Sequence, residues 1–487
     1  MILGIEGSHM YDSGAGDGGL GEIIDAAIEA DLQHNGWHKY SGDGLMRIFA
    51  AGAHAVLTPA TGSIEIRNIS EPAEQEVEAA VKDAERIYAK WPSKIEQAFA
   101  KWVELPTNGF NTSEVAWLEN AEGEIRTGAV SPTDTDGSSS TSKPPIGLPN
   151  QRLASDLNNL DDRMGKLNGL YAETFKEMYV SPLPVTIQSL GALIACLALA
   201  CRGQGAIWEA ATEDLEKVKK QAAAAMKASA PGGGGSIGPT VLAVGGAIAG
   251  LIAAIPTGGA SIVGVATLIG AGAGLVKEID GASGSSKKVE VQLGASTPDG
   301  VLDNINAALT DLSAAIRGQE EEIRNFLSNV HSETTSHREA FDLMAPRAER
   351  GNVLDRQQDV SVDAGTIANI TELWIPTICG DLRAARGELV VTSRVFSTRP
   401  SGVGLVQDGA WPEFEKVQDV TVELLTNMVR DLEAGADALN DAARTIGLQD
   451  QEIAAEARRK SDEINATDND FVTLPTPHGS SYPPIVD

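Results

Sequence analysis

The sequence predicts a mainly α protein: a long-helix bundle with a central apolar helical hairpin, a C-terminal two-helix hairpin and minor β content. Three observations predict this fold class. Residues 228–276 contain no Asp, Glu, Lys or Arg, although these residues make up 22% of the chain. Apolar residues recur every three or four positions from Leu302 to Val330, and they do so again after Trp411. A chain of 487 residues also has room for about two to four domains.

Residues 1–70 are Gly-rich and are expected to form a small α/β remnant. A helical pattern covers residues 21–32, and two apolar runs flank Ser41-Gly-Asp-Gly44, which favours a β-hairpin. This turn resembles the hairpin that carries a metal-binding aspartate in class III nucleotide cyclases, and Gly4-Ile-Glu-Gly-Ser8 is loosely similar to the opening strand of that family. The resemblance implies a degenerate nucleotide-cyclase-like N-terminus in which Asp43 would act, although the family's opening aspartate is missing. A plain Asp-Gly hairpin is the alternative.

Residues 71–126 are predicted to be helical. The longer helix covers residues 71–105, where Pro92 should kink or divide it, and a short helix follows about Trp117. Residues 127–150 are low in complexity and too polar to pack, so we expect a flexible linker or a long loop there.

Residues 151–345 are predicted to form the long-helix bundle. A helical pattern runs from Arg152 to Lys227, Lys288–Leu293 alternates as a short strand, and Pro298 begins the clearest helix of the chain. The long helices before and after the apolar stretch should pair antiparallel. This pairing would place the apolar hairpin at the tip of a stalk.

The apolar hairpin, residues 237–276, is the first candidate site. Pro256-Thr-Gly-Gly is turn chemistry, and each flanking arm is roughly 22 to 30 Å long as a helix, which just spans the hydrocarbon core of a bilayer. Small residues at four-residue spacing let two helices approach closely, in a membrane or in a dry bundle core, so both interpretations stay open. The residues expected to make the membrane contact are Val241, Ile248, Leu251, Ile252, Pro256, Gly258, Ile262, Val263, Leu268 and Ile269.

The composition excludes several function classes. A formal charge of −30 disfavours binding to nucleic acid and electrostatic binding to anionic lipid, so any membrane contact must be apolar. Three cysteines do not make a disulfide framework, and no His or Cys spacing indicates a metal site. The N-terminus lacks the pattern of a Sec signal peptide, so export would need another route. We find no catalytic motif and therefore predict a non-enzyme without cofactor or catalytic residues.

Residues 346–460 are predicted to form a second helical hairpin, with Asp408-Gly-Ala-Trp-Pro-Glu-Phe414 in its turn. Residues 461–487 are predicted to be a disordered tail. This hairpin resembles the W-x-G superfamily of actinobacterial type VII (ESX) secretion substrates, in which two antiparallel helices are joined by a Trp-bearing turn and followed by a Tyr-x-x-x-Asp/Glu export signal. The resemblance implies that Trp411 is the turn tryptophan and that Ile446 and Asp450 occupy the two signal positions. The sequence departs from the family where Pro-Glu replaces x-Gly and where Ile446 replaces the tyrosine.

Three functional hypotheses follow. The first is a non-enzymatic type VII substrate, secreted or placed in the cell envelope, whose partners are a membrane, the secretion machinery or a helical partner protein, and which could assemble as a homo-oligomer. The order of long helix, apolar hairpin and long helix is also similar to that of helical pore-forming cytolysins, in architecture only. The second hypothesis is a structural bundle with the hairpin as permanent core. The third is the nucleotide-handling N-terminus described above.

Overall fold

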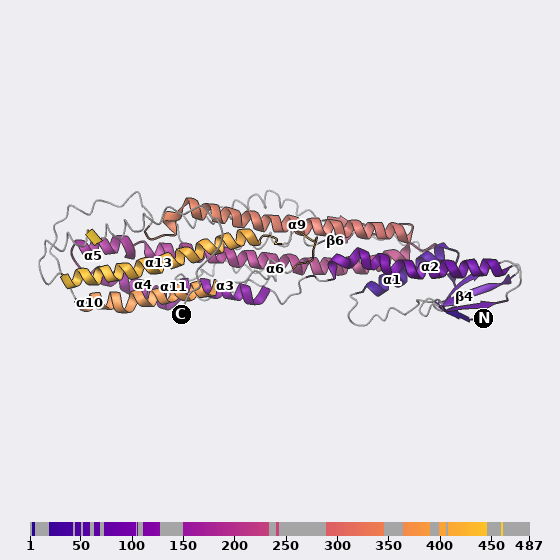
Figure 1. Cartoon of the computed structure of the whole chain (residues 1–487), viewed down its shortest axis with the longest axis horizontal. Coiled ribbons are helices and arrows are strands. Elements are labelled where there is room, and N and C mark those ends of the chain that lie inside the picture. Colours follow the sequence, from indigo (N-terminus) through magenta and orange to yellow (C-terminus); the bar gives the residue numbers. More distant parts are fainter. Residues whose placement is uncertain are drawn as a thin grey trace, which may run out of the picture.

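The computed structural model is an elongated bundle of long helices with a small β-sheet at one end (Figure 1). The mainly α fold class with minor β content is therefore confirmed. The structure describes residues 2–4, 19–41, 44–49, 52–58, 63–68, 73–103, 105, 111–126, 150–232, 240–242, 289–344, 364–389, 399–405, 408–445 and 459–460.

The central element is α6, Leu183–Ala228, a helix of 46 residues. Pro182 and Pro184 begin it, where the missing N–H groups cost nothing, and an Ala-rich run favours helix at its other end. It contacts α1, α3, α9 and α13, and most residues of its charge-free part are buried. The described bundle is thus organised around α6, and not around the apolar stretch 228–276 that the composition singles out.

The helix α9, Pro298–Ser336, runs antiparallel to α6, as predicted (Figure 1). Thr297 caps its N-terminus by accepting a hydrogen bond from the backbone N–H of Gly300 at 3.2 Å. The predicted apolar positions from Leu302 to Val330 are buried along one face. Because this face packs on α6, the two long helices share one core.

The N-terminal part forms a five-stranded antiparallel sheet with α1, Leu20–His34. The alternation of His54–Thr58 and Ser63–Arg67 buries Leu57, Ile64 and Ile66, a strand pattern that the sequence analysis missed. The predicted hairpin is confirmed, since Met46 pairs with His38 and the Tyr40 N–H donates to the Gly44 carbonyl at 2.8 Å. In sheet order the strands are β1 (Ile2–Gly4), β5 (Ser63–Arg67), β4 (His54–Thr58), β3 (Leu45–Ile48) and β2 (His38–Lys39).

The helix α2, Glu74–Phe99, passes through Pro92 without a break, so of the predicted kink or division at Pro92 the division is wrong. Proline removes one backbone hydrogen bond, and tertiary packing offsets the loss. Trp91 and Ile95, on either side of Pro92, are fully buried, and Trp91 Nε1 donates to Asp31 Oδ2 at 2.9 Å. A short 3-10 turn, Ala100–Trp102, follows, and α3, Asn111–Ile125, is the expected helix about Trp117.

The ends of the polar stretch 127–149 are joined by a backbone hydrogen bond, from Asn150 N–H to the Arg126 carbonyl at 2.7 Å. Asn150 also caps α4, Gln151–Met164, through its side-chain oxygen. The stretch itself lies outside the described residues. The residues that flank it are adjacent ends of α3 and α4 in one bundle, so the stretch does not separate two domains.

The C-terminal part is an antiparallel helical hairpin, as predicted. Its first arm contains α10 (Ala364–Asn369), a π-helical turn η8 (Ile370–Trp374) and α11 (Ile375–Glu388), and its second arm is α13 (Trp411–Thr445). Contacts of Cys379 with Val429 and of Leu389 with Gln418 fix the antiparallel register. The hairpin packs on α3, α6 and α9, so it is an integral part of the bundle (Figure 1).

Candidate functional site

The apolar stretch leaves and rejoins the described chain at a two-stranded ribbon. The strands are β6, Thr240–Leu242, and β7, Val289–Val291, with Val241 paired to Glu290. The short strand expected at 288–293 is thus confirmed, whereas Val241, expected in a helical arm, lies in a strand. Its β-branched side chain suits either state, and pairing with β7 decides between them.

The other predicted hairpin positions lie outside the described residues. These are Ile248, Leu251, Ile252, Pro256, Gly258, Ile262, Val263, Leu268 and Ile269. Their helical form and their contact with a membrane therefore stay predictions. The ribbon does establish that the two ends of 243–288 lie side by side.

The end of the bundle from which this segment departs is braced by α1 and α2. His34 Nε2 lies 2.7 Å from the Ser229 carbonyl just after α6, and Lys90 and Lys94 bind Asp299 at the start of α9, at 2.7 and 2.8 Å. Partial burial disfavours ionisation of Asp299, but the two lysine hydrogen bonds outweigh it and lower its pKa. The N-terminal helices therefore flank the end of the α6–α9 pair at which the sequence predicts the tip of the stalk.

One helical run among the described residues, Tyr171–Ala228, is long and apolar enough to cross a membrane by length and composition. Of its most apolar window, 67% is buried inside the bundle. The neighbours of α6 account for this apolar character, because a helix covered on several sides has an apolar surface all round.

A buried ion pair holds the loop between α11 and α13 to the long helices. The side chains of Arg399 and Glu320 are 2% and 0% exposed, and Arg399 Nη2 donates to Glu320 Oε2. The same carboxylate accepts hydrogen bonds from Gln204 Nε2 at 2.9 Å and from the Leu405 N–H at 2.7 Å. The Arg399 guanidinium carbon lies 5.7 Å from the ring centroid of Trp208. Helices α6 and α9 and the loop therefore meet at one polar cluster.

The loop needs glycine at this cluster. Gly404 has φ of +73°, and a Cβ there would lie 2.4 Å from Glu320 Oε2. The positive φ is strained for other residues, and the contact leaves no room for a side chain. The sequence analysis placed Asp408–Phe414 in this turn but did not find the roles of Arg399 and Glu320, because their pairing joins positions far apart in the chain.

Trp411 is the first residue of α13 and is half-buried, with its ring stacked on Phe414 at 5.3 Å between centroids. The tryptophan is therefore packed against its own helix at the start of the second arm. Ile446 and Asp450 lie outside the described residues, so the structure does not place the export-signal positions.

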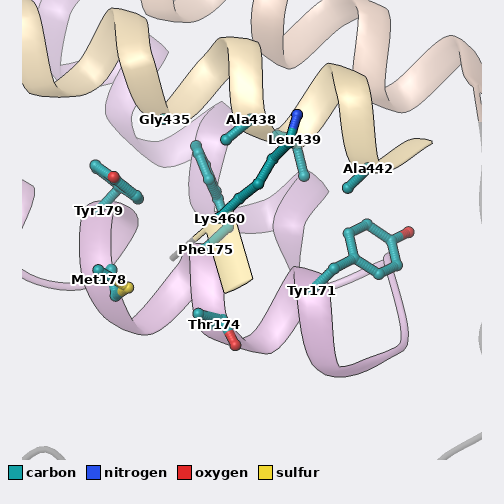
Figure 2. Close-up of a pocket in the computed structure, with 10 residues that line it drawn as sticks. All are labelled: Tyr171, Thr174, Phe175, Met178, Tyr179, Gly435, Ala438, Leu439, Ala442 and Lys460. Carbon is teal, nitrogen blue, oxygen red and sulfur yellow. The ribbon is translucent and has the colours of Figure 1, made fainter. Parts of the chain in front are cut away.

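A groove of about 410 Å³, which includes space open to solvent, lies between α13 and the segment formed by α5, Leu170–Phe175, and the π-helical turn η4, Lys176–Val180 (Figure 2). Its first wall carries aromatic rings and Met178, and its second wall is α13. The principal lining residues are Tyr171, Phe175, Met178, Tyr179, Gly435, Ala438, Leu439, Ala442 and Lys460. The groove is therefore mainly apolar, with one cation.

The described residues contain no group of three His, Cys, Asp or Glu side chains that could hold a metal ion. The first strand β1 and the hairpin strand β3 are separated in the sheet by β5 and β4, which puts them about 14 Å apart at 4.8 Å per strand. Asp43 lies outside the described residues. The sheet order thus gives no support to a site shared by the opening strand and the hairpin turn.

No family model, curated protein or solved structure matches this chain.

Proposed function

We propose that this protein is a non-enzymatic helical-bundle protein, exported by a type VII route, that acts on a membrane through the apolar stretch 237–276. The main structural support for membrane action is the β6–β7 ribbon. Because it pairs residues 240–242 with 289–291, the residues between can leave the bundle without separating α6 from α9. A local extension of this kind costs far less free energy than opening a packed core.

The packing of α6 supports the same proposal. Its apolar surface is already in contact with α1, α3, α9 and α13. The apolar stretch adds a second charge-free region at the end of α6, and its small residues suit close helix packing in lipid. A soluble bundle that carries such a stretch would lower its free energy by burying the stretch against an apolar surface.

The antiparallel C-terminal hairpin with Trp411 at the start of its second arm supports the export part. Its agreement with the W-x-G pattern is one of architecture, since the x-Gly and the tyrosine are replaced. Export is tested by measuring the protein in culture filtrate of the source organism with and without its type VII motor. Undiminished export without the motor would rule out this route.

Membrane action is tested by dye release from liposomes. We expect the unmodified protein to release dye and Ile252→Asp and Val263→Asp to lose that activity, because a charge at mid-bilayer costs about 2.5 to 3.5 kcal/mol. Val103→Asp, at a position 73% exposed, is the matched control and should leave release unchanged. If the protein releases no dye and the two hairpin variants unfold at lower urea concentration, the stretch is permanent core and the membrane proposal is wrong.

A further inference from the structure

We propose that the groove between α5–η4 and α13 is the docking site of the chain's own C-terminal segment, residues 453–464, bound as an amphipathic helix. This inference goes beyond the proposed function. It concerns an intramolecular contact that can be measured on purified protein, whatever the route of export.

The first argument is the position of Lys460. It is one of the residues that line the groove, and its Nζ binds Asp441 Oδ2 on α13 at 2.8 Å. Figure 2 shows the Lys460 side chain lying in the groove, with its nitrogen directed toward α13. Because Lys460 follows Asp441 by 19 residues, the chain returns to α13 after that helix ends.

The second argument is the shape of the groove. Gly435, Ala438 and Ala442 lie at spacings of three and four on α13, so one stripe of this helix has little or no side chain. A Cβ on Gly435 would lie 2.8 Å from the ring of Tyr179, which shows that this ring packs directly on the α13 backbone. Beyond this contact, the small side chains of Ala438 and Ala442 leave a trough along α13, and a trough of this kind suits a helix better than a compact ligand.

The third argument is the sequence around Lys460. Arg459 and Lys460 are helical in the structure. On a helix through these residues, Ile453, Ala457 and Ile464 would lie on one flank of Lys460, and Glu456 and Glu463 on its other flank, because all five precede or follow it at helical spacing. Lys460 therefore stands at the boundary between an apolar stripe and an acidic one, and the apolar stripe is the one that faces the groove. An apolar wall and an apolar helix face meet, with Lys460 and Asp441 as the polar contact at the rim.

The docked segment follows closely after the export-signal-like positions Ile446 and Asp450. Residues 446–452 connect the end of α13 to the docked helix.

Limited trypsin digestion of the full chain tests the proposal, because Arg458, Arg459 and Lys460 are three consecutive cleavage sites within the segment. We expect the double variant Ile453→Asp/Ile464→Asp to be cut there at least tenfold faster than the unmodified protein. Proteolysis of this kind tracks the population of the open form. Ala455→Asp, on the opposite side of the same helix, is the matched control and should be cut at the unmodified rate.

The groove wall is tested in the same assay. Ala438→Trp fills the groove and should speed cleavage at these sites, whereas Ala434→Trp, at an exposed position on the same helix, should not. Equal cleavage rates in the unmodified protein, the double variant and Ala438→Trp would overturn the proposal. Binding of a fluorescent fatty acid that Ala438→Trp abolishes, with an unchanged trypsin pattern, would assign the groove to an apolar ligand and would also overturn it.

Discussion

The buried pair of Arg399 and Glu320 gives the sharpest test of the packing described above. Substituting Arg399→Met leaves the Glu320 carboxylate fully buried, with hydrogen bonds from Gln204 and Leu405 but without a counter-charge. Breaking a buried ion pair on one side costs about 3 to 5 kcal/mol, because the remaining charge is not solvated. Glu320→Met should cost a similar amount, since the guanidinium then loses its only charged partner in the cluster.

The double variant Arg399→Met/Glu320→Met should be far less destabilised than the sum of the two single variants. It contains no buried charge, and the remaining cost is that of Gln204 and the Leu405 N–H without their acceptor, about 1 to 3 kcal/mol each. The Nε and Nη1 of Arg399 have no hydrogen-bond partner among the described residues, which further limits what the intact pair contributes. The single variants together cost about 6 to 10 kcal/mol and the double variant about 2 to 6 kcal/mol, so a coupling of about 3 to 4 kcal/mol is expected from the middle of these ranges.

Urea denaturation followed by far-ultraviolet circular dichroism measures these free energies of unfolding. Arg383→Met is the matched control, because Arg383 and Glu433 form an ion pair in which both side chains are about half exposed, at 45% and 48%. Exposed pairs contribute at most about 1 kcal/mol. Single variants at Arg399 and Glu320 that behave like this control, or a double variant as unstable as the sum, would refute the reasoning.

Three further predictions follow from the packing, the stretch 127–149 and a half-buried histidine. Gly435→Ala should lower the free energy of unfolding by about 1 to 3 kcal/mol in urea, because its Cβ would overlap the Tyr179 ring, and Tyr179→Leu should restore part of the loss. Replacement of residues 127–149 by a short Gly-Ser linker should shift the urea midpoint little, since the flanking residues are already hydrogen-bonded to each other; a large loss would contradict the loop assignment. Burial, with a smaller effect of a nearby lysine, lowers the pKa of His331 below its usual 6.5, so the folded state loses stability as the pH falls below that value. His331→Gln should therefore match the unmodified protein near pH 8 and exceed its thermal stability near pH 5, and equal behaviour at both pH values would count against this titration.

Local sequence signals located several elements correctly. Thr297-Pro-Asp-Gly300 is a helix start by its capping residue and first-turn proline, and the structure begins α9 there. The alternation at 288–293 and the Asp-Gly turn of the N-terminal hairpin were equally readable. These features depend on residues within a few positions of one another, which is why a single sequence is enough to find them.

The sequence alone did not show which of its apolar segments forms the core of the bundle. Val180–Cys201 and 228–276 are both charge-free, and the sequence analysis gave the second the central place. Transfer free energy depends on apolar area and not on what covers it, so composition cannot distinguish a core helix from an extension. The contacts of α6 with α1, α3, α9 and α13 are what identify the core of the described bundle.

The sequence by itself determined the mainly α class, the long amphipathic helices and the C-terminal hairpin, because periodicity and caps are local properties of the chain. Only the tertiary structure decided that α6 is the central helix, that the residues flanking the polar stretch 127–149 lie side by side, and that Arg399 meets Glu320. Each of these depends on segments distant in the chain being brought together. Burial and pairing arise from that juxtaposition, and no short stretch of sequence encodes it.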